Sequence, residues 1–303
     1  MLTAAIRPLS PPDGDALLDL CLARDLAEVG EPNTTHEEIA ADLSSPTMTT
    51  VGIDRPTGGL AGYAWVEYFD GHETVWGDVV VRREAAPEVA GALLDWLRQQ
   101  AAAVAPDRKL WVFTDSREDA KIGLLEAAGG RVIRRYYRML VDFTQTPRPP
   151  VPDLGPGVEI RGIDDSEADL RTVHRIVDTA FTDHFGHEAT AYDAWHHSVV
   201  SGFCPDLSLF WLATVDGEPA AAVYSGTLPN HGHVDTLGTL RQFRGRGLAR
   251  ALLLTTFAEF ERRGVTRVTL GVDAANPNAL ALYESVGMAM HRNGMRYELD
   301  PLR

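Results

Sequence analysis

A proline-rich stretch in the middle of the chain decides how this sequence can fold. Residues 144–157 read TQTPRPPVPDLGPG and contain five prolines. Proline fixes φ and lacks a backbone N–H, so neither a helix nor a sheet interior continues through such a stretch. The 303-residue chain is therefore predicted to form two domains of ordinary size, residues 1–143 and 158–303, joined by a Pro-rich linker at 144–157.

The two predicted domains look like copies of each other. Each opens with a short strand that carries an Ile-Arg pair, followed by a helical stretch and then by a strand–turn–strand hairpin. Near the end of each half, Arg138–Asp142 mirrors Arg296–Asp300 at an offset of 158 residues, and the same offset places Gly129 on Gly287. The chain is therefore predicted to be an internal duplication.

The second half alternates between patterns typical of strands and of helices. The expected helices cover about 166–182, 190–200, 248–263 and 277–286, and the expected strands about 209–215, 220–226, 233–240 and 267–272, before two short closing strands. Hairpins followed by strand–helix units indicate an α/β fold, a mixed sheet with helices on both faces.

Charge and composition narrow the classes of partner. The net charge of −15 gives an acidic surface that repels phosphate backbones, so nucleic acid is not an expected partner. The sequence shows neither a signal peptide nor an apolar run of roughly 18 residues, so no membrane partner is expected. Two cysteines, Cys21 and Cys204, make no disulfide framework. We expect a cytoplasmic protein, either a monomer or a homodimer.

A glycine–arginine turn between a predicted strand and a long helix is the most informative segment. Residues 244–249 read RGRGLA. Glycines let a ligand approach the backbone, the start of a helix presents free N–H groups, and two arginines add positive charge. The turn predicts a pyrophosphate site, although a plain helix start with solvated arginines would have the same sequence. A P-loop and a dinucleotide-binding fingerprint are both absent.

Two motifs resemble those of the GCN5-related N-acetyltransferase (GNAT) family. Arg244–Ala249 resembles the family's pyrophosphate loop, and Asn276–Met288 resembles its second motif, with Met where the family has Phe. The resemblance covers residues 158–303 and implies acetyl-CoA as cosubstrate. The repeat implies two tandem GNAT-like domains, a layout similar to that of mycothiol synthase and its actinobacterial relatives. No residue identifies the acceptor.

The resemblance also implies which residues contact the coenzyme. The backbones of Leu237 and Thr239 would pair with the pantetheine arm, and Leu237 would donate its N–H to the acetyl carbonyl. Asn276 either contacts the coenzyme or caps the following helix. The full predicted set is Leu237, Thr239, Arg244, Gly245, Arg246, Gly247, Leu248, Ala249 and Asn276.

Acetylation of an amine needs a base for the amine proton and an acid for the leaving thiolate, because an alkyl amine is protonated at neutral pH. By resemblance, Tyr283 is the candidate acid, although a tyrosine here could simply pack on the core. Asp235 is the candidate base, directly or through water, at a position where many family members carry Glu. It could equally bind substrate or be an exposed strand carboxylate. His233, two residues earlier on the same side of the strand, is the rival base.

Several histidines raise the question of a metal. The pairs His184/His187 and His196/His197 lack the spacing of a zinc protease, and Cys204 has no second thiol nearby, so no metal is expected. In the family, the loop between the first two helices lines the acceptor pocket. His184 is therefore predicted to lie on the substrate side.

The offset of 158 residues also tests the first half. It replaces a loop glycine with proline, which removes an amide donor, and a second glycine with a bulky valine. It places a carboxylate where Asn276 stands and a leucine where Tyr283 stands. The first-half positions are Ala86, Pro87, Val89, Gly91, Glu118 and Leu125. The first half is therefore predicted to be a degenerate domain that does not bind CoA, with a structural role.

Together these features predict an acyltransferase. We expect an acetyl-CoA-dependent N-acetyltransferase that transfers an acetyl group to the amine of a small molecule, by direct attack in the C-terminal domain. Two alternatives stay open: a non-catalytic CoA-binding or regulatory module, and a protein or peptide N-acetyltransferase.

Overall fold

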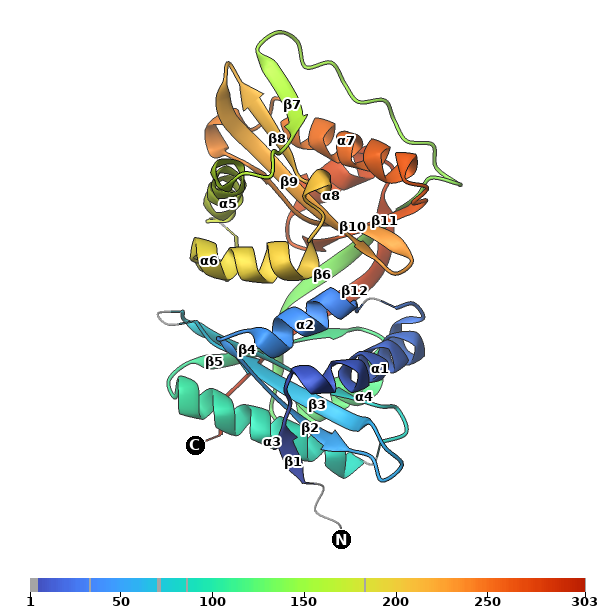
Figure 1. Ribbon diagram of the computed structural model, residues 1–303, viewed down its shortest axis with the longest axis vertical. Helices are drawn as coiled ribbons and strands as arrows, with labels where there is room; N and C mark the ends of the chain where they lie inside the picture. The colour runs from blue at the N-terminus through green and yellow to red at the C-terminus, as the bar shows by residue number, and fades with distance from the viewer. Residues whose placement is uncertain (1–4, 33, 70–71, 86, 183, 303) are drawn as a thin grey trace. The chain divides into compact units, whose positions relative to one another are not determined.

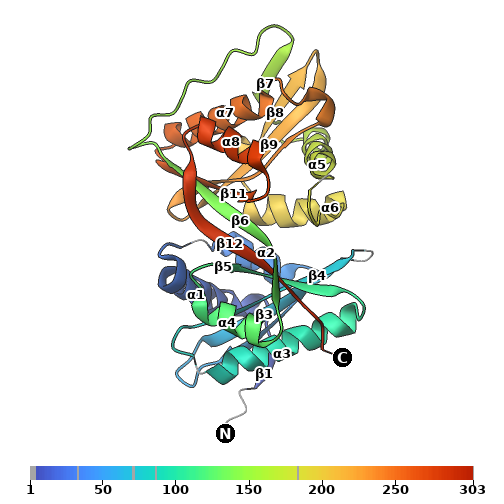
Figure 2. The ribbon, with the colours of Figure 1, turned by 180° about the vertical axis from the view of Figure 1, so that it is seen from behind.

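A computed structural model of the protein describes residues 5–32, 34–69, 72–85, 87–182 and 184–302 (Figure 1; Figure 2). The chain forms two compact units: unit 1 is Met1–Tyr136 with Arg292–Arg303, and unit 2 is Tyr137–His291. Each unit is a mixed sheet covered by helices, so the predicted α/β fold class is confirmed. Within the described residues, no helix combines the length and the apolar character that a bilayer crossing requires.

Unit 1 has helices on both faces of its sheet. A Cβ on Gly77 would strike Leu97 of α3 (Pro87–Val104), whereas Tyr63 packs in a cluster with Leu17 of α1 (Gly14–Arg24). Helix α2 (His36–Ser44) contributes Ile39 to that second cluster, and α4 (Asp119–Ala127) shares the core of α3. The strands run in the order β1 (Ile6–Pro8), β2 (Met48–Asp54), β3 (Leu60–Glu67), β4 (Thr74–Val81), β5 (Lys109–Asp115) and the end of β12 (Ala289–Leu299). Strands β4 and β5 are parallel.

Unit 2 repeats this arrangement. A Cβ on Gly238 would touch α5 (Glu167–Phe181), whereas one on Gly232 would strike Phe260 of α7 (Leu248–Arg262), so these helices cover opposite faces. Strands β10 and β11 are parallel. The strand order is the end of β6 (Arg131–Asp142), β11 (Arg267–Asp273), β10 (His231–Thr239), β9 (Glu218–Leu228), β8 (Trp211–Val215) and β7 (Val158–Gly162). The other helices are α6 (Tyr192–Trp195), which continues as a π-helix over His196–Phe203, and α8 (Pro277–Ser285).

The two units exchange their closing strands. Strands β6 and β12 each begin in one unit and end in the other. Met295, Tyr297 and Leu299 of β12 are 6%, 1% and 1% exposed in the core of unit 1, and Met139 and Val141 of β6 are buried in the core of unit 2. The halves 1–143 and 158–303 therefore describe the sequence repeat, whereas the compact units differ from it by one strand each. The expectation of two short closing strands is wrong, because the chain closes with the single 11-residue strand β12.

The repeat itself holds at the level of single elements. Moving β11 back by 158 residues places it residue for residue on β5, and the same shift places α8 on α4. The shift also places α7 on the last 15 residues of α3. These three elements of unit 2 therefore each have a counterpart in unit 1.

The Pro-rich segment lies along helix α7. Near its start, Arg148 Nε is 2.5 Å from Glu261 Oε2, close to the end of α7. Near its other end, Leu154 Cδ2 is 3.2 Å from where a Cβ on Gly247 would stand, at the start of α7. Residues 148–154, when extended, span on the order of 20 Å, as does the helix between those two anchors. The segment is thus an ordered strut that ends beside the predicted phosphate turn.

Helix α5 is held against the sheet by an apolar stripe, an N-cap and an ion pair. Its core stripe consists of buried Leu170, Val173, Ile176, Val177 and Ala180. Ser166 caps the helix by accepting from the Asp169 amide at 3.3 Å, and Asp169 pairs with Arg161 of β7 through both oxygens. These contacts fix the helix against the sheet edge, and therefore fix what its other residues face.

Candidate active site

The glycine–arginine turn has the geometry of an anion-binding helix start. Gly245 and Gly247 have φ of +77° and +79°, a conformation that favours glycine, and Gly247 is the N-cap of α7. Ala251 bonds back to the Gly247 carbonyl at 3.0 Å. The amides just before Ala251 lie in the first turn of α7, where an N–H group has no carbonyl acceptor within the helix. These amides are therefore available to bind an anion.

The two arginines of the turn have different roles. Arg244 donates from Nε to the Thr239 carbonyl at 3.2 Å and from Nη2 to the Ala180 carbonyl at 3.1 Å. It therefore ties the turn to β10 and to the end of α5. Arg246 is exposed, with its guanidinium 5.7 Å from the Phe243 ring centroid. Of the two predicted cations, Arg246 is the one with a charge available to a ligand.

The remaining predicted coenzyme residues lie around this turn. Leu237 and Thr239 are half-buried on β10, and the buried Thr239 hydroxyl has no hydrogen-bond partner among the described residues. Leu248 is buried at the start of α7, and Ala249 follows half-buried. Asn276 caps α8, because its Oδ1 accepts from the Ala279 amide at 3.1 Å. A capping role alone thus accounts for the asparagine.

A β-bulge defines the position of the predicted base. In the pairing of β10 with β9, Val234 faces Ser225 and Thr236 faces Tyr224, so Asp235 is the extra residue between them. The bulge sets Asp235 and Thr236 side by side, and the Thr236 hydroxyl donates to Asp235 Oδ2 at 3.0 Å. The Tyr224 phenol, which faces Thr236 across the strand pair, also acts on this carboxylate and lowers its pKa.

The surroundings of Asp235 change its acidity. Desolvation by nearby protein raises the pKa of the Asp235 carboxyl above its ordinary value, and the hydrogen bonds from Thr236 and Tyr224 offset part of the rise. Asp235 is nevertheless exposed to solvent, which is consistent with a residue at the bottom of a surface depression. Burial raises the pKa of the Tyr224 phenol well above 10, so Tyr224 stays protonated and remains a donor. A carboxylate with a raised pKa is a stronger base than an exposed one.

The rival base, His233, is engaged elsewhere. Its Nδ1 lies 2.9 Å from the Thr269 hydroxyl on β11, and its ring nitrogens lie 3.2 Å from Arg138 Nη1. The structure therefore engages the His233 ring with Thr269 and Arg138, and places the Asp235 carboxylate beside the Thr236 hydroxyl.

Tyr283 lies on α8 and packs against the core of unit 2. Burial raises the pKa of its phenol to about 12, so it carries its proton throughout the physiological range. Within the described part of the chain, no hydrogen bond or ion pair joins its hydroxyl to Asp235, His233 or any other residue. The hydroxyl is thus free to donate to a ligand.

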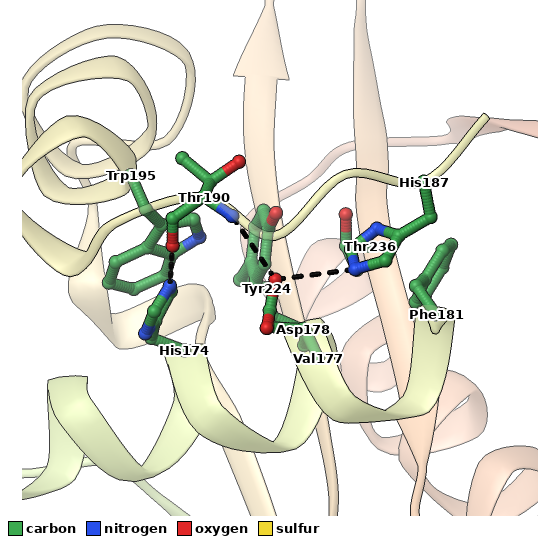
Figure 3. Close-up of a pocket in the computed structure, with 9 residues that line it drawn as sticks. All are labelled: His174, Val177, Asp178, Phe181, His187, Thr190, Trp195, Tyr224 and Thr236. Carbon is green, nitrogen blue, oxygen red and sulfur yellow. Dashed lines mark hydrogen bonds and ion pairs between the residues drawn. The ribbon is translucent and has the colours of Figure 1, made fainter. Parts of the chain in front are cut away.

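A pocket of about 170 Å³ lies beside the bulge, and Figure 3 shows the nine residues that line it. Tyr224 and Thr236 belong to its lining, so Asp235 is one hydrogen bond away from the cavity. All nine lining residues belong to unit 2: His174, Val177, Asp178, Phe181, His187, Thr190, Trp195, Tyr224 and Thr236. The pocket is the candidate acceptor site.

The loop after α5 is fastened across this pocket. Asp178 Oδ1 accepts from the Thr190 amide at 3.4 Å and lies 3.3 Å from His187 Nε2 (Figure 3). One helical turn earlier, His174 Nε2 donates to the Thr190 carbonyl at 2.8 Å. The ring of the predicted substrate residue His184 is tilted by 45° against that of Phe181, with centroids 4.2 Å apart, and His184 is not among the lining residues. Two other histidines of the same region, at 174 and 187, line the pocket.

Several lining residues carry a sequence signal, although the predicted site did not include them. His174, Asp178 and Phe181 follow a spacing of four and three residues, which puts them on one helix face beside the apolar stripe. Two polar residues next to a core stripe are a pattern typical of a pocket wall. Tyr224 carries no such signal, because only the bulge brings its hydroxyl to Asp235.

In unit 1 the corresponding positions are filled by other contacts. Pro87 starts α3, Val89 is buried, and Ala86 lies outside the described residues. Glu118 is buried, and it accepts from the Asp115 amide at 2.8 Å and from Arg24 Nη1 at 3.2 Å. Burial disfavours its charge, but Lys121 and Arg24 outweigh that effect and lower its pKa. Leu125, the counterpart of Tyr283, lies fully in the core.

Comparison with known proteins assigns the family. Residues 170–288 match the family described as Acetyltransferase (GNAT) family, a range that contains the glycine–arginine turn, the bulge, the pocket and the whole of α8 with Tyr283. Residues 170–288 therefore form a GNAT acetyltransferase domain, and the resemblance drawn from two motifs is confirmed. Its enzyme class is that of an N-acetyltransferase.

Relatives and solved structures extend the similarity over the whole chain. The mycothiol acetyltransferase of Cellulomonas flavigena is 29% identical over 86% of this chain and 78% of its own length, and that of Thermomonospora curvata is 29% identical over 95% and 96%. A GCN5-related N-acetyltransferase from Sphaerobacter thermophilus has a TM-score of 0.74 at 24% identity, covering 97% and 94% of the two chains. A tandem GNAT protein from the clavulanic acid biosynthesis pathway has a TM-score of 0.74 at 16% identity, covering 99% of each. These structures confirm the tandem fold.

Proposed function

We propose that this protein is an acetyl-CoA-dependent N-acetyltransferase that acts on the amine of a small molecule, with its chemistry in unit 2. The observation that carries the proposal is the presence, within one unit, of an anion-binding helix start and an acidic pocket beside a bulged strand. The helix start suits a diphosphate, and the pocket suits an amine.

The residues of the turn fit the phosphate end of the coenzyme. Gly245 and Gly247 expose amides with no side chain in the way, and Arg246 offers a charge. The main chain of Leu237 and Thr239 would hold the pantetheine arm. Arg244 would act indirectly, by holding the turn against β10 and α5, and Asn276 would act as the cap of α8.

The acyl transfer itself needs two proton movements. The amine nitrogen forms a bond to the acetyl carbon, the carbon–sulfur bond breaks, and the amine loses one proton while the thiolate gains one. Asp235 is placed to receive the amine proton, directly or through water, because Thr236 and Tyr224 connect it to the pocket wall. His233 is the weaker candidate because its ring is already engaged with Thr269 and Arg138. Tyr283 would protonate the thiolate, a role supported by a hydroxyl that keeps its proton and has no other partner in the described part of the chain.

The names of the relatives suggest which acceptor amine to test first. Two curated relatives that match this chain over most of its length are named mycothiol acetyltransferase. The amine precursor of mycothiol is therefore the first acceptor to assay, followed by other small amines.

Unit 1 is proposed to bind no coenzyme, so titration of the whole protein with acetyl-CoA should give one site per chain. Gly247→Ala should weaken that binding about tenfold, because an L-residue in the left-handed region costs roughly 1–2 kcal/mol and its Cβ would meet Leu154 at 3.2 Å. The matched control is Gly91→Ala in unit 1, where a Cβ meets open space. Isothermal calorimetry measures both. Two sites per chain, or a loss of binding in Gly91→Ala, would contradict the assignment.

The hydrogen bond from Tyr224 gives a prediction on pH. Asp235 must be ionised to accept a proton, so kcat/KM should fall as the pH drops through its raised pKa. Tyr224→Phe removes a donor to the carboxylate, which raises that pKa further and moves the acid limb of the profile to higher pH. Asp235→Asn should abolish the limb.

Tyr192→Phe is the control for this pH profile. Tyr192 belongs to the same aromatic cluster, but its hydroxyl donates to Glu167 at 2.9 Å and has no part in the bulge. Its loss should leave the limb in place. An unchanged limb in Tyr224→Phe would refute the link between Tyr224 and the base.

A further inference from the structure

The pocket beside the bulge has apolar walls. Val177 and Phe181 of α5, Trp195 of α6 and Tyr224 of β9 line it, and the Trp195 and Tyr224 rings lie edge to face with centroids 5.9 Å apart. Such walls favour a ligand with an apolar body.

The side chains that line this pocket include a carboxylate but no lysine or arginine. Among its nine lining residues, Asp178 is the single carboxylate, and none is lysine or arginine. Two histidines complete the titratable lining: His187 faces Asp178 at 3.3 Å, and His174 faces the Thr190 carbonyl. Asp235 adds a second carboxylate behind Thr236. None of the nine lining residues is therefore a permanent cation that could pair with an anionic ligand.

One oxygen of Asp178 is left for a ligand. Both the Thr190 amide and His187 approach Oδ1, and no described residue donates a hydrogen bond to Oδ2. The Asp178 side chain is 28% exposed, so Oδ2 is in contact with solvent at the pocket. The loop contacts on Oδ1 hold the carboxylate in place and leave its second oxygen available to an N–H donor.

Building on the proposed function, we propose that this pocket selects acceptors that bear an amine and no carboxylate, with Asp178 as the residue that makes the selection. An ammonium or amide N–H of the acceptor would donate to Oδ2, and the apolar part would lie on the aromatic walls. A free carboxylate in the same pocket would face Asp178 and Asp235 without a cationic partner. Unmodified amino acids are therefore excluded, whereas amines and carboxyl-blocked amino acids enter.

The test compares L-leucinamide with L-leucine, which differ only in the carboxylate. Binding to the full-length protein is measured by calorimetry, with and without CoA. We expect leucinamide to bind at least tenfold more tightly, because a carboxylate about 5 Å from Asp178 is repelled by at least that factor at an effective dielectric constant near 20. Asp178→Asn should reduce the preference to within about threefold, since it keeps an oxygen for the loop contacts and loses the charge.

Asp193→Asn is the matched control, because it removes the charge of an exposed residue on the neighbouring helix α6. It should keep the preference of the unmodified protein. Equal affinities, tighter binding of leucine, no binding of either compound at millimolar concentration, or a preference that survives Asp178→Asn would each overturn the proposal.

Binding needs no turnover, so the two proposals can fail separately. If leucinamide binds selectively but no amine is ever acetylated, the proposed function fails and the selection stands. If leucine and leucinamide are acetylated with equal kcat/KM, the selection fails and the function stands.

Discussion

Tyr283→Phe should lower kcat by roughly 100-fold or more while the affinity for acetyl-CoA stays near that of the unmodified protein. The loss follows from general acid catalysis, which contributes about 10²–10⁴-fold when a positioned side chain delivers the proton. The ring keeps its contacts with the core of unit 2, and the hydroxyl has no hydrogen bond to break within the described part of the chain. Steady-state kinetics and calorimetry of the same preparation separate the two effects.

Tyr297→Phe is the control for a lost tyrosine hydroxyl. Tyr297 lies in unit 1, where its hydroxyl donates to Glu126 at 3.2 Å. Its replacement should affect stability more than turnover. If Tyr283→Phe retains full kcat, Tyr283 is not the acid; if it loses coenzyme affinity instead, its role is in binding.

Separate expression of residues 1–143 and 158–303 should give two chains that do not fold. The first fragment lacks Met295, Tyr297 and Leu299, which are almost completely buried in unit 1. At about 1.5–3 kcal/mol for each such side chain, the loss is about 5–9 kcal/mol. That is most of the roughly 5–15 kcal/mol by which a folded domain is usually stable. The second fragment lacks Met139 and Val141 in the same way.

Circular dichroism and thermal melting of each fragment give the measurement. The control is the whole chain with a protease site inserted at Val151, which is 41% exposed in the Pro-rich segment. Once cut there, the chain still contains both closing strands and should melt cooperatively. A sharp melting transition in the isolated 1–143 fragment would show that β12 is not needed.

Sequence patterns were sufficient for the repeat and for the turn. The offset of 158 residues places β11 on β5 and α8 on α4 without a gap, because proline and glycine mark the ends of these elements. Glycine at positions 245 and 247 indicates a positive φ, since residues with a side chain rarely adopt that conformation. Local chemistry of this kind can be read directly from the chain.

Contacts between distant segments could not be predicted in that way. Tyr224 reaches Asp235 because a bulge adds one residue to β10, and no residue type requires a bulge at that point. Arg244 is predicted to bind phosphate, a prediction that stays open, but its hydrogen bonds to the carbonyls of Thr239 and Ala180 gave no sign in the sequence. Similarly, the sequence repeat predicts a domain boundary on each side of the Pro-rich segment. In the structure, the end of β12 belongs to unit 1 and the end of β6 belongs to unit 2.

The exchange of closing strands also sets the order in which this protein can mature on the ribosome. Unit 1 runs to Tyr136 and then needs Arg292 onward, so at about 5–20 residues per second its last strand is synthesised roughly 10–30 s later. During that interval the free edge of β5 is open to other strands, including those of neighbouring nascent chains. Production yield should therefore depend on chaperone supply and on elongation rate more than the stability of the finished protein would suggest.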